Sequence, residues 1–270
     1  ELGLEVGALN STLPDNQALI ALFRDLEFKN WLEALLDNDL GAMVEAASNE
    51  TAEDTRLEDT PPQVAPLNVI TILDSATLDD WLNRLSAADF FAFDTETTSL
   101  NYMVAEIVGV SFAVEAGTAA YVPLAHDYPG APEQLSRDEV LAQLKPILED
   151  ESKGKLGQHL KYDANVLMNH GITLRGIRED TMLESYVLDA TGSRHDLDTL
   201  ALKYLGQRTI HFEDIAGKGA KQITFNQVPV EQAAPYAAED AEVTLRLHAV
   251  LSARLEVEPL SLIHISEPTR

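Results

Sequence analysis

The sequence predicts an α/β fold in which a mixed sheet is flanked by helices. Three consecutive segments within residues 90–124 are rich in β-branched and aromatic residues, which is typical of an antiparallel meander. A strand and a helix are expected before them, in residues 67–87, and the pattern after residue 136 is mostly helical. Strands that are followed by helices in this way indicate a sheet covered by helices.

The first 66 residues are expected to lie outside that fold. Residues 1–36 contain apolar side chains at helical spacing after the turn-like LPDN, which predicts one amphipathic helix. Residues 37–66 contain eight acidic residues, one basic residue and no aromatic residue, and end in TPPQVAP. A segment of this composition cannot bury enough apolar surface to order itself, so we interpret it as a flexible acidic linker.

Each element of the core has its own signal. The run LNVITIL predicts a strand, and the helix after it should be capped at its N-terminus by Ser75 or Thr77. The meander should consist of FFAFDTE, EIVGVSFAVE and TAAYVPLA, with a turn at Ala116 and Gly117 between the last two. A short strand is expected before KYD. Helices are then predicted in RDEVLAQLKPILED, LKYDANVLMNH, TMLESYVLDA, LDTLALKYLG and VEQAAPYAAEDAEVTLRLHAVLSARL.

Composition restricts the function. The chain has 270 residues, of which 45% are apolar, and it lacks cysteine, so disulfides and thiolate metal sites are excluded. A metal would have to bind oxygen or imidazole. The seven histidines include no pair at a spacing of three or four, which gives a zinc cluster little support. No apolar run approaches the length of a membrane span, so we expect a cytoplasmic protein.

The net charge of −26 argues against nucleic acid as a partner, because phosphate binding usually depends on Lys and Arg. The acidic linker accounts for part of that charge, however. Ten basic residues fall between Lys153 and Lys221, which leaves room for a local basic surface.

Three acidic motifs are the strongest candidates for chemistry. Asp94 and Glu96 stand two residues apart on a predicted strand, so both point to the same side of the sheet and repel each other unless a cation lies between them. Asp163 is expected in the first turn of a helix. Tyr236 and Asp240 are four residues apart on one helix face. Taken alone, the Asp94–Glu96 pair is equally well explained as a solvated strand end, and Asp163 and Asp240 are each more often solvated helix acids.

Together and in this order, Asp-x-Glu, KYD and Tyr-x-x-x-Asp resemble the three motifs of the 3′→5′ exonuclease domain of DNA polymerase I. The resemblance covers about Leu67 to Glu256 and includes AHDYPGAP, DTMLESYVL, RHDLDTLA, FEDIAGKGAKQITFNQ and YAAEDAEVTL. It implies a ribonuclease-H-like fold for residues 67–256. Residues 1–36 resemble the end of a preceding 5′-nuclease domain. Residues 257–270 end in LSLIHISEPTR, which resembles a translated sequencing adapter, so the polymerase domain is expected to be missing.

The resemblance also implies a mechanism. Asp94, Glu96 and Asp240 would hold one of two divalent cations, Asp94 would also face the second, and Asp163 would support that second cation through water. Mg²⁺ or Mn²⁺ suits an all-oxygen site, with Zn²⁺ also able to occupy the tighter position. Tyr236 would orient the attacking water with Glu96, which assigns the chain to the tyrosine branch of this nuclease superfamily.

Further residues match positions that approach the DNA in the family. Leu100 and Phe212 would press against the terminal bases, although both are also ordinary core residue types. The remaining matches are Thr97, Gln158, His159, Tyr162 and Arg194. Arg194 fits a structural role equally well. His159 departs from the family, because this position usually carries Asn, and the change introduces a titratable ring.

Three functions remain open at this point. The first is a proofreading exonuclease that acts on single-stranded 3′ ends of DNA, as a monomer linked to 5′-nuclease and polymerase domains in a bacterial, nucleoid-associated parent protein. The second is a relic domain that binds DNA ends without cutting them. The third is a ribonuclease-D-like enzyme that acts on RNA. The presence of all four carboxylates together with Tyr236 favours an active nuclease.

Overall fold

The computed structural model describes residues 20, 22, 67–190 and 194–257. The chain divides into two units between Pro62 and Gln63, and the fold below is that of the second unit. The expectations for residues 1–36 and 37–66, and for the terminal segment beyond residue 257, lie outside the described residues.

The core of this unit is a six-stranded mixed sheet with the strand order β1-β4-β3-β2-β5-β6. Strands β2, β3 and β4 form the predicted antiparallel meander, while β1 pairs parallel to β4, and β5 pairs parallel to both β2 and β6. The strands are β1 (Asn68–Thr71), β2 (Phe90–Thr97), β3 (Ile107–Glu115), β4 (Thr118–Pro123), β5 (Gly154–Gly157) and β6 (Ile177–Asp180).

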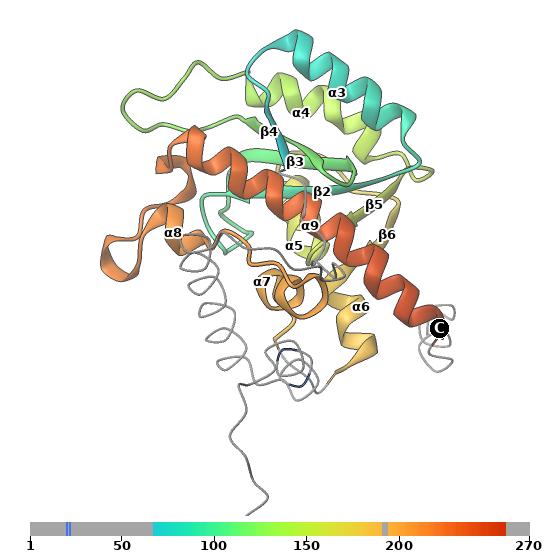
Figure 1. Cartoon of the computed structure of the whole chain (residues 1–270). Helices are drawn as coiled ribbons and strands as arrows, with labels where there is room; N and C mark the ends of the chain where they lie inside the picture. The colour runs from blue at the N-terminus through green and yellow to red at the C-terminus, as the bar shows by residue number, and fades with distance from the viewer. Residues whose placement is uncertain (1–19, 21, 23–66, 191–193, 258–270) are drawn as a thin grey trace, which may run out of the picture. The chain divides into compact units, whose positions relative to one another are not determined.

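Helices cover both faces of the sheet. Figure 1 shows the long helix α9 lying across one face, with α3 and α4 on the other side of the strands. The helices are α3 (Ser75–Ala87), α4 (Arg137–Leu148), α5 (Leu160–Asn169), α6 (Thr181–Leu188), α7 (Leu197–Leu200), α8 (Phe212–Ala216) and α9 (Val230–Val257), with a π-helix η2 (Ala201–Leu205) and 3₁₀ turns η3 (Gly219–Lys221) and η4 (Phe225–Gln227). The predicted α/β class is confirmed.

Small side chains let α9 lie close to the sheet. Ala92 on β2 packs with Ala238 and Ala241 of the helix. Farther along, Val108 and Tyr121 of the sheet pack against the N-terminal part of α9. Because alanine keeps the two backbones near each other, polar side chains on these facing surfaces are brought within reach of one another.

The opposite face of the sheet holds the larger apolar core. Phe91 and Phe93 alternate with the residues that face α9, and they pack with Trp81 of α3 and Leu144 of α4. Their burial explains why β2 reads as an apolar run up to its acidic end.

Two local predictions need correction. The N-cap of α3 is Asp74, neither Ser75 nor Thr77, because the Asp74 carboxylate accepts the backbone N–H of Thr77 at 2.9 Å and Ser75 is already helical. The segment LDTLALKYLG is not one regular α-helix, since α7 continues directly into the π-helix η2. Among the described residues, no helix is both long enough and apolar enough to cross a membrane.

Candidate active site

Strand β2 presents Asp94 and Glu96 to α9. Ala92 faces that helix, and alternation along the strand places Asp94 and Glu96 on the same side. The pairing with β3 shifts register between Glu96 and Thr97, so the strand is irregular where the acids lie. Glu96 is buried, and its Oε1 atom has no hydrogen-bond partner. A buried carboxylate oxygen without a partner is costly unless a cation or a proton neutralises it.

Helix α5 brings a third acid to the same end of the sheet. Strands β2 and β5 are parallel, so their carboxyl ends meet at one edge, and α5 starts shortly after β5. Asp163, in the first turn of α5, is 2% exposed. Its Oδ1 atom accepts the Thr95 backbone N–H at 3.0 Å and the Thr95 hydroxyl at 2.5 Å. The carboxylate is thereby fixed to the strand that carries the other two acids.

Helix α9 supplies the fourth acid and a tyrosine. Tyr236 and Asp240 lie one turn apart, and a hydrogen bond from Tyr236 lowers the pKa of Asp240, although burial and neighbouring charges outweigh it. The Tyr236 ring packs beside Phe225 and Phe212, with ring centres 5.9 and 6.3 Å apart respectively. Aromatic contacts therefore hold the ring, which leaves its hydroxyl to the acidic cluster.

We call Asp94, Glu96, Asp163 and Asp240 the carboxylate cluster. Burial is the largest cause of a raised pKa at all four, and it raises the pKa of Asp94 to about 6. The charge of Asp94 raises the pKa of each of the other three further. Asp240, Glu96 and Asp94 also raise the pKa of Tyr236, with Asp240 the largest cause. These mutual effects show that the predicted residues come together in one acidic site, in which Glu96 and Asp163 are buried and the others are partly buried.

The metal-free protein should lose stability as the pH rises. A carboxyl whose pKa is higher in the folded state binds its proton more tightly there, so its contribution is present at low pH and is lost between pH 3.8 and about 6 for Asp94. The loss is on the order of 3 kcal/mol for this group. Urea unfolding in a chelator at pH 4 to 8 measures it, and saturating Mn²⁺ should restore stability at the upper end.

Asp94→Asn is the control for that prediction, because it removes the titrating group but keeps the shape of the side chain. His126 and His248 also have shifted pKa values, yet they titrate in both proteins. The difference between the two proteins therefore reports Asp94 together with the pKa increases that its charge causes at Glu96, Asp163 and Asp240. Without metal, the variant should equal wild type near pH 4 and exceed it at pH 8. Parallel pH profiles of the two proteins would contradict the burial of a charged Asp94.

Several predicted substrate contacts are tied into the protein itself. The Gln158 amide donates to the His195 carbonyl at 2.7 Å, and its oxygen accepts the Thr181 hydroxyl at 2.5 Å. The Tyr162 hydroxyl donates to the Ser99 carbonyl at 2.5 Å and also lies 2.5 Å from the Thr97 hydroxyl. The Gln158 bonds thus connect the residue before His159 to His195 and to the start of α6, and the Tyr162 bonds connect α5 to the end of β2 and the loop after it.

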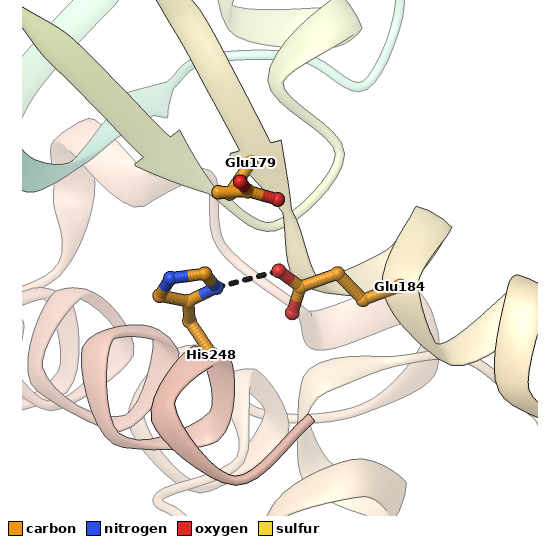
Figure 2. A group of neighbouring side chains, drawn as sticks. All are labelled: Glu179, Glu184 and His248. Atoms are coloured by element: carbon orange, nitrogen blue, oxygen red, sulfur yellow. Dashed lines mark hydrogen bonds and ion pairs between the residues drawn. The ribbon is translucent and has the colours of Figure 1, made fainter. Parts of the chain in front are cut away.

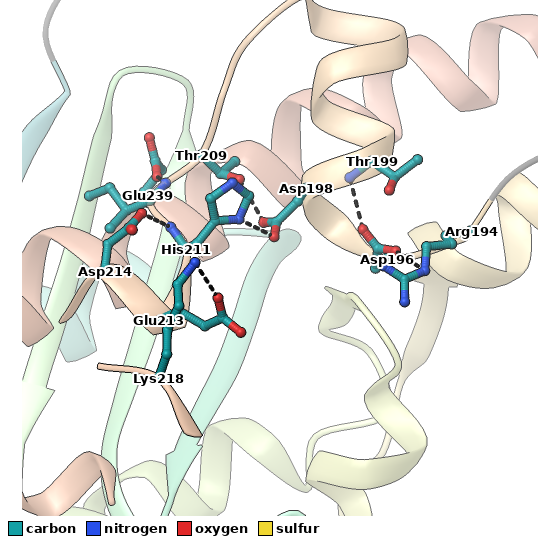
Figure 3. Close-up of polar contacts among 11 residues, drawn as sticks. Arg194, Asp196, Asp198, Thr199, Thr209, His211, Glu213, Asp214, Lys218 and Glu239 are labelled. Carbon is teal, nitrogen blue, oxygen red and sulfur yellow. Dashed lines mark hydrogen bonds and ion pairs between the residues drawn. The ribbon is translucent and has the colours of Figure 1, made fainter. Parts of the chain in front are cut away.

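Leu100 and Phe212 differ in environment. Leu100 is 95% exposed in the loop after β2, where Met103 and Val104 are exposed as well, so it is not a core residue. Phe212 is partly buried and stacks on Phe225, with ring centres 6.2 Å apart. Arg194 is largely exposed, and its Nε atom lies 4.0 Å from a carboxylate oxygen of Asp196 (Figure 3).

His159 has a backbone conformation that explains why its position favours Asn. Its φ of 65° makes it the one described non-glycine residue with a positive φ, and Asn adopts this left-handed region more readily than most residues. The Asp180 carboxylate accepts the backbone N–H of His159 at 3.1 Å and that of Leu160 at 2.8 Å. The start of α5 is thus capped by Asp180, while the exposed His159 ring makes no capping bond.

Sequence reasoning missed two groups beside the cluster. The His126 Nδ1 atom lies 2.9 Å from the Val228 carbonyl, which can only accept, so the Tyr121 hydroxyl donates to His126 Nε2 at 2.7 Å. Burial, followed by the charges of Glu96 and Asp94, raises the pKa of Tyr121. A tyrosine inside an apolar strand gives no sequence signal for such a position.

The second missed group contains Asp198, which raises the pKa of both Asp240 and Tyr236. Its carboxylate lies 2.6 Å from His211 Nδ1 and accepts the Thr209 hydroxyl at 2.6 Å (Figure 3). It lies within RHDLDTLA, but nothing in that string separates Asp198 from a solvated helix acid.

Three curated relatives are DNA polymerase I proteins. That of Pseudomonas aeruginosa is 58% identical over 96% of this chain and 27% of its own length. Those of Rhizobium leguminosarum and Chloroflexus aurantiacus are 45% and 35% identical, over 72% and 95% of this chain and 21% and 28% of their own lengths. The chain therefore spans about a quarter of the length of these relatives.

Solved structures share the fold at low identity. The polymerase domain of Pol1 from M. smegmatis, in complex with DNA primer-template and dNTP, aligns with a TM-score of 0.53 and 22% identity, over 71% of this chain and 29% of that one. Brucella melitensis NrnC aligns with the same TM-score and identity, over 74% of this chain and 87% of its own. These likenesses confirm the ribonuclease-H-like fold.

The family follows from a match that includes residues of all six strands. The model of the 3′-5′ exonuclease family covers residues 69–256, from within β1 to the last turn of α9, and includes the carboxylate cluster and Tyr236. The chain belongs to the 3′-5′ exonuclease family.

Proposed function

We propose that this chain is a two-cation 3′→5′ exodeoxyribonuclease that removes nucleoside monophosphates from single-stranded or frayed DNA 3′ ends. The observation that supports it best is the carboxylate cluster: four acids from β2, α5 and α9, of which Glu96 and Asp163 are buried and Asp94 and Asp240 partly buried, each with a raised pKa. A fold does not maintain such repulsion for stability, so the cluster is explained by bound cations.

The residues fit divalent cations. All four side chains offer carboxylate oxygens, which Mg²⁺ and Mn²⁺ prefer, and the unpartnered Glu96 Oε1 atom is available as a ligand. Asp94, Glu96 and Asp240 would hold the tighter ion, at which Zn²⁺ also fits, and Asp94 and Asp163 the second. A structure of Brucella melitensis NrnC with bound Mg²⁺ has the same fold. When bound, the ions would neutralise the scissile phosphate and lower the pKa of the attacking water.

The chain's own groups orient that water. The charge of Glu96 raises the pKa of Tyr236, and the charges of Asp94 and Asp240 raise the pKa of both groups. The Tyr236 hydroxyl and the Glu96 carboxylate therefore lie beside the same charges, where both can reach one water molecule. The raised pKa of Tyr236 keeps its hydroxyl protonated and able to donate. Asp163 is held by Thr95, so it acts from a fixed position.

The substrate strand would run past the loop after β2 and the start of α8. Exposed Leu100 and partly buried Phe212 offer apolar surfaces for stacking on bases without reading their identity. Thr97, Tyr162 and Gln158 position that surface through their internal hydrogen bonds, whereas His159 and Arg194 are exposed beside the strand's path.

The chain would act as the proofreading module of a bacterial, cytoplasmic DNA polymerase I. The Pseudomonas aeruginosa relative matches 96% of this chain, including residues before the nuclease fold. In that setting the chain is a monomeric segment: residues 1–36 would be the end of a 5′-nuclease domain, residues 37–66 a linker and residues 67–256 the nuclease domain, and the polymerase domain would be covalently linked to it in the parent protein. The proposal includes the domain limits: the 5′-nuclease segment ends at residue 36, the linker at residue 66 and the nuclease domain at residue 256.

The function is tested with matched DNA and RNA single strands that carry a 5′ label, so that shortening from the 3′ end gives a ladder. With Mg²⁺, we expect a DNA ladder and released nucleoside monophosphates. Faster degradation of RNA would instead identify a ribonuclease-D-like enzyme. Binding of DNA ends without any shortening, with either Mg²⁺ or Mn²⁺, would identify a relic domain and reject the proposal.

A further inference from the structure

Three potential metal ligands meet at a place separate from the carboxylate cluster. Glu179 lies on the edge strand β6, Glu184 on α6 and His248 on α9, and Figure 2 shows the three side chains turned toward one another. One ligand atom from each lies within 4.8 Å of the other two. His248 follows Asp240 by eight residues of α9, which separates the two groups by about 12 Å along the helix.

Glu184 has an unsatisfied oxygen at this place. Its side chain is 4% exposed, and its Oε1 atom lies 2.5 Å from His248 Nδ1. Its other oxygen, Oε2, is buried and has no hydrogen-bond partner. Since a buried carboxylate normally satisfies both oxygens, Oε2 requires either a cation or a proton shared with Glu179, whose pKa is raised by burial and also by a hydrogen bond to Glu184.

The local charge also favours a cation. Burial raises the pKa of Glu179, and the charge of Glu184 raises it further, while His248 and Arg178 act in the opposite direction. Burial lowers the pKa of His248, but its hydrogen bond to Glu184 and the charges of Glu184 and Glu179 outweigh that effect. Two carboxylates thus share one imidazole. The centre of the Phe90 ring lies 5.2 Å from the centre of the His248 ring, so Phe90 partly shields this place from water.

We propose that Glu179, Glu184 and His248 form a structural site for one Zn²⁺ ion. Two carboxylate oxygens and one imidazole nitrogen are a usual ligand set for zinc, with a water molecule completing the tetrahedron. Ligand distances of about 2.0–2.2 Å place the ligand atoms roughly 3.3 Å apart. Small side-chain rotations reach this geometry. The Glu184 oxygen and the His248 nitrogen, now 2.5 Å apart, would separate by less than about 1 Å, and the Glu179 oxygen would move closer to both.

This ion would join elements that position the nuclease residues. Helix α9 carries Asp240, and α6 follows directly on Asp180, whose carboxylate caps the helix that carries Asp163. A cation between β6, α6 and α9 therefore fixes the C-terminal half of α9 to the corner of the sheet. The site is independent of the proposed reaction, since none of its ligands belongs to the carboxylate cluster.

Zn²⁺ calorimetry on the full chain tests the site, in an Asp94→Asn/Asp240→Asn background that removes cation binding at the carboxylate cluster. We expect one Zn²⁺ per chain and a higher melting temperature with Zn²⁺ than without. Adding Glu179→Gln should weaken binding more than about tenfold and remove the rise in melting temperature. Adding Glu139→Gln, on the exposed side of α4, should change neither.

Co²⁺ gives a second readout, because a tetrahedral site produces intense visible absorption that Glu179→Gln should abolish. Glu179 is the deciding position, since its replacement leaves the buried Glu184–His248 pair in place. Equal Zn²⁺ affinity in the Glu179→Gln and Glu139→Gln proteins would overturn the proposal. A background protein that binds no Zn²⁺ would overturn it as well.

Discussion

Replacing Asp94 with alanine is expected to abolish cation binding at the carboxylate cluster and cleavage of DNA together. Asp94 is the neighbour that raises the pKa of Glu96, Asp163 and Asp240 alike, so it lies at the centre of the cluster. Its removal takes a ligand from both proposed ions. The rate should fall by more than about 10³-fold, because one positioned group alone contributes 10² to 10³.

Calorimetric Mn²⁺ titrations and single-turnover cleavage of a labelled single strand measure the two effects. Asp240→Asn should behave like Asp94→Ala, since it also removes a charged ligand. Asp79→Ala, at an exposed position of α3, is the matched control and should leave both quantities unchanged. If Asp94→Ala keeps full Mn²⁺ binding at the cluster, or cleaves at the wild-type rate, the assignment of this residue is wrong.

Replacing Tyr236 with phenylalanine should slow cleavage by about 10² to 10³ while Mn²⁺ affinity stays near wild type. The ring is retained, so its packing against Phe225 and Phe212 persists. What disappears is the hydroxyl that lies among the charges of Asp240, Glu96 and Asp94. The same titrations and single-turnover assays apply.

Tyr121→Phe is the matched control, because Tyr121 is a fully buried tyrosine whose pKa is raised by burial and then by the charges of Glu96 and Asp94. Its hydroxyl donates to His126, however, so its loss should cost stability, about 1–3 kcal/mol, more than rate. A Tyr236→Phe protein that cleaves as fast as wild type would show that the hydroxyl does not orient the water. Equal rate losses in the two variants would also contradict a specific role for Tyr236.

Sequence patterns within single elements predicted the strands of the meander and the main helices. Alternation and β-branched residues predicted the meander β2-β3-β4, and helical spacing predicted α5 and α9. The acids of β2 could be placed on one face because side chains alternate along a strand. The resemblance then linked them to Asp163 and to the pair on α9, which spacing alone could not have joined.

Features that depend on tertiary contacts were not predicted. The edge strand β6 is four residues long and largely exposed, so it carries no apolar run. The left-handed backbone of His159 follows from how β5 meets α5, which the residue type did not signal. Histidine spacing argues against a zinc cluster, yet Glu179, Glu184 and His248 come together from three elements. Glu179 and His248 are 69 residues apart in the sequence. Spacing rules detect ligands that lie close together in the sequence.

Anomalous diffraction from crystals grown with Mn²⁺ and a single strand of DNA tests the central claim most directly. The strand should carry a phosphorothioate at its last linkage, so that cleavage is slow. We expect two Mn²⁺ peaks about 4 Å apart, both next to Asp94, one also next to Glu96 and Asp240 and the other on the side of Asp163. Absence of any peak at the carboxylate cluster, while the DNA 3′ end is bound there, would contradict the account.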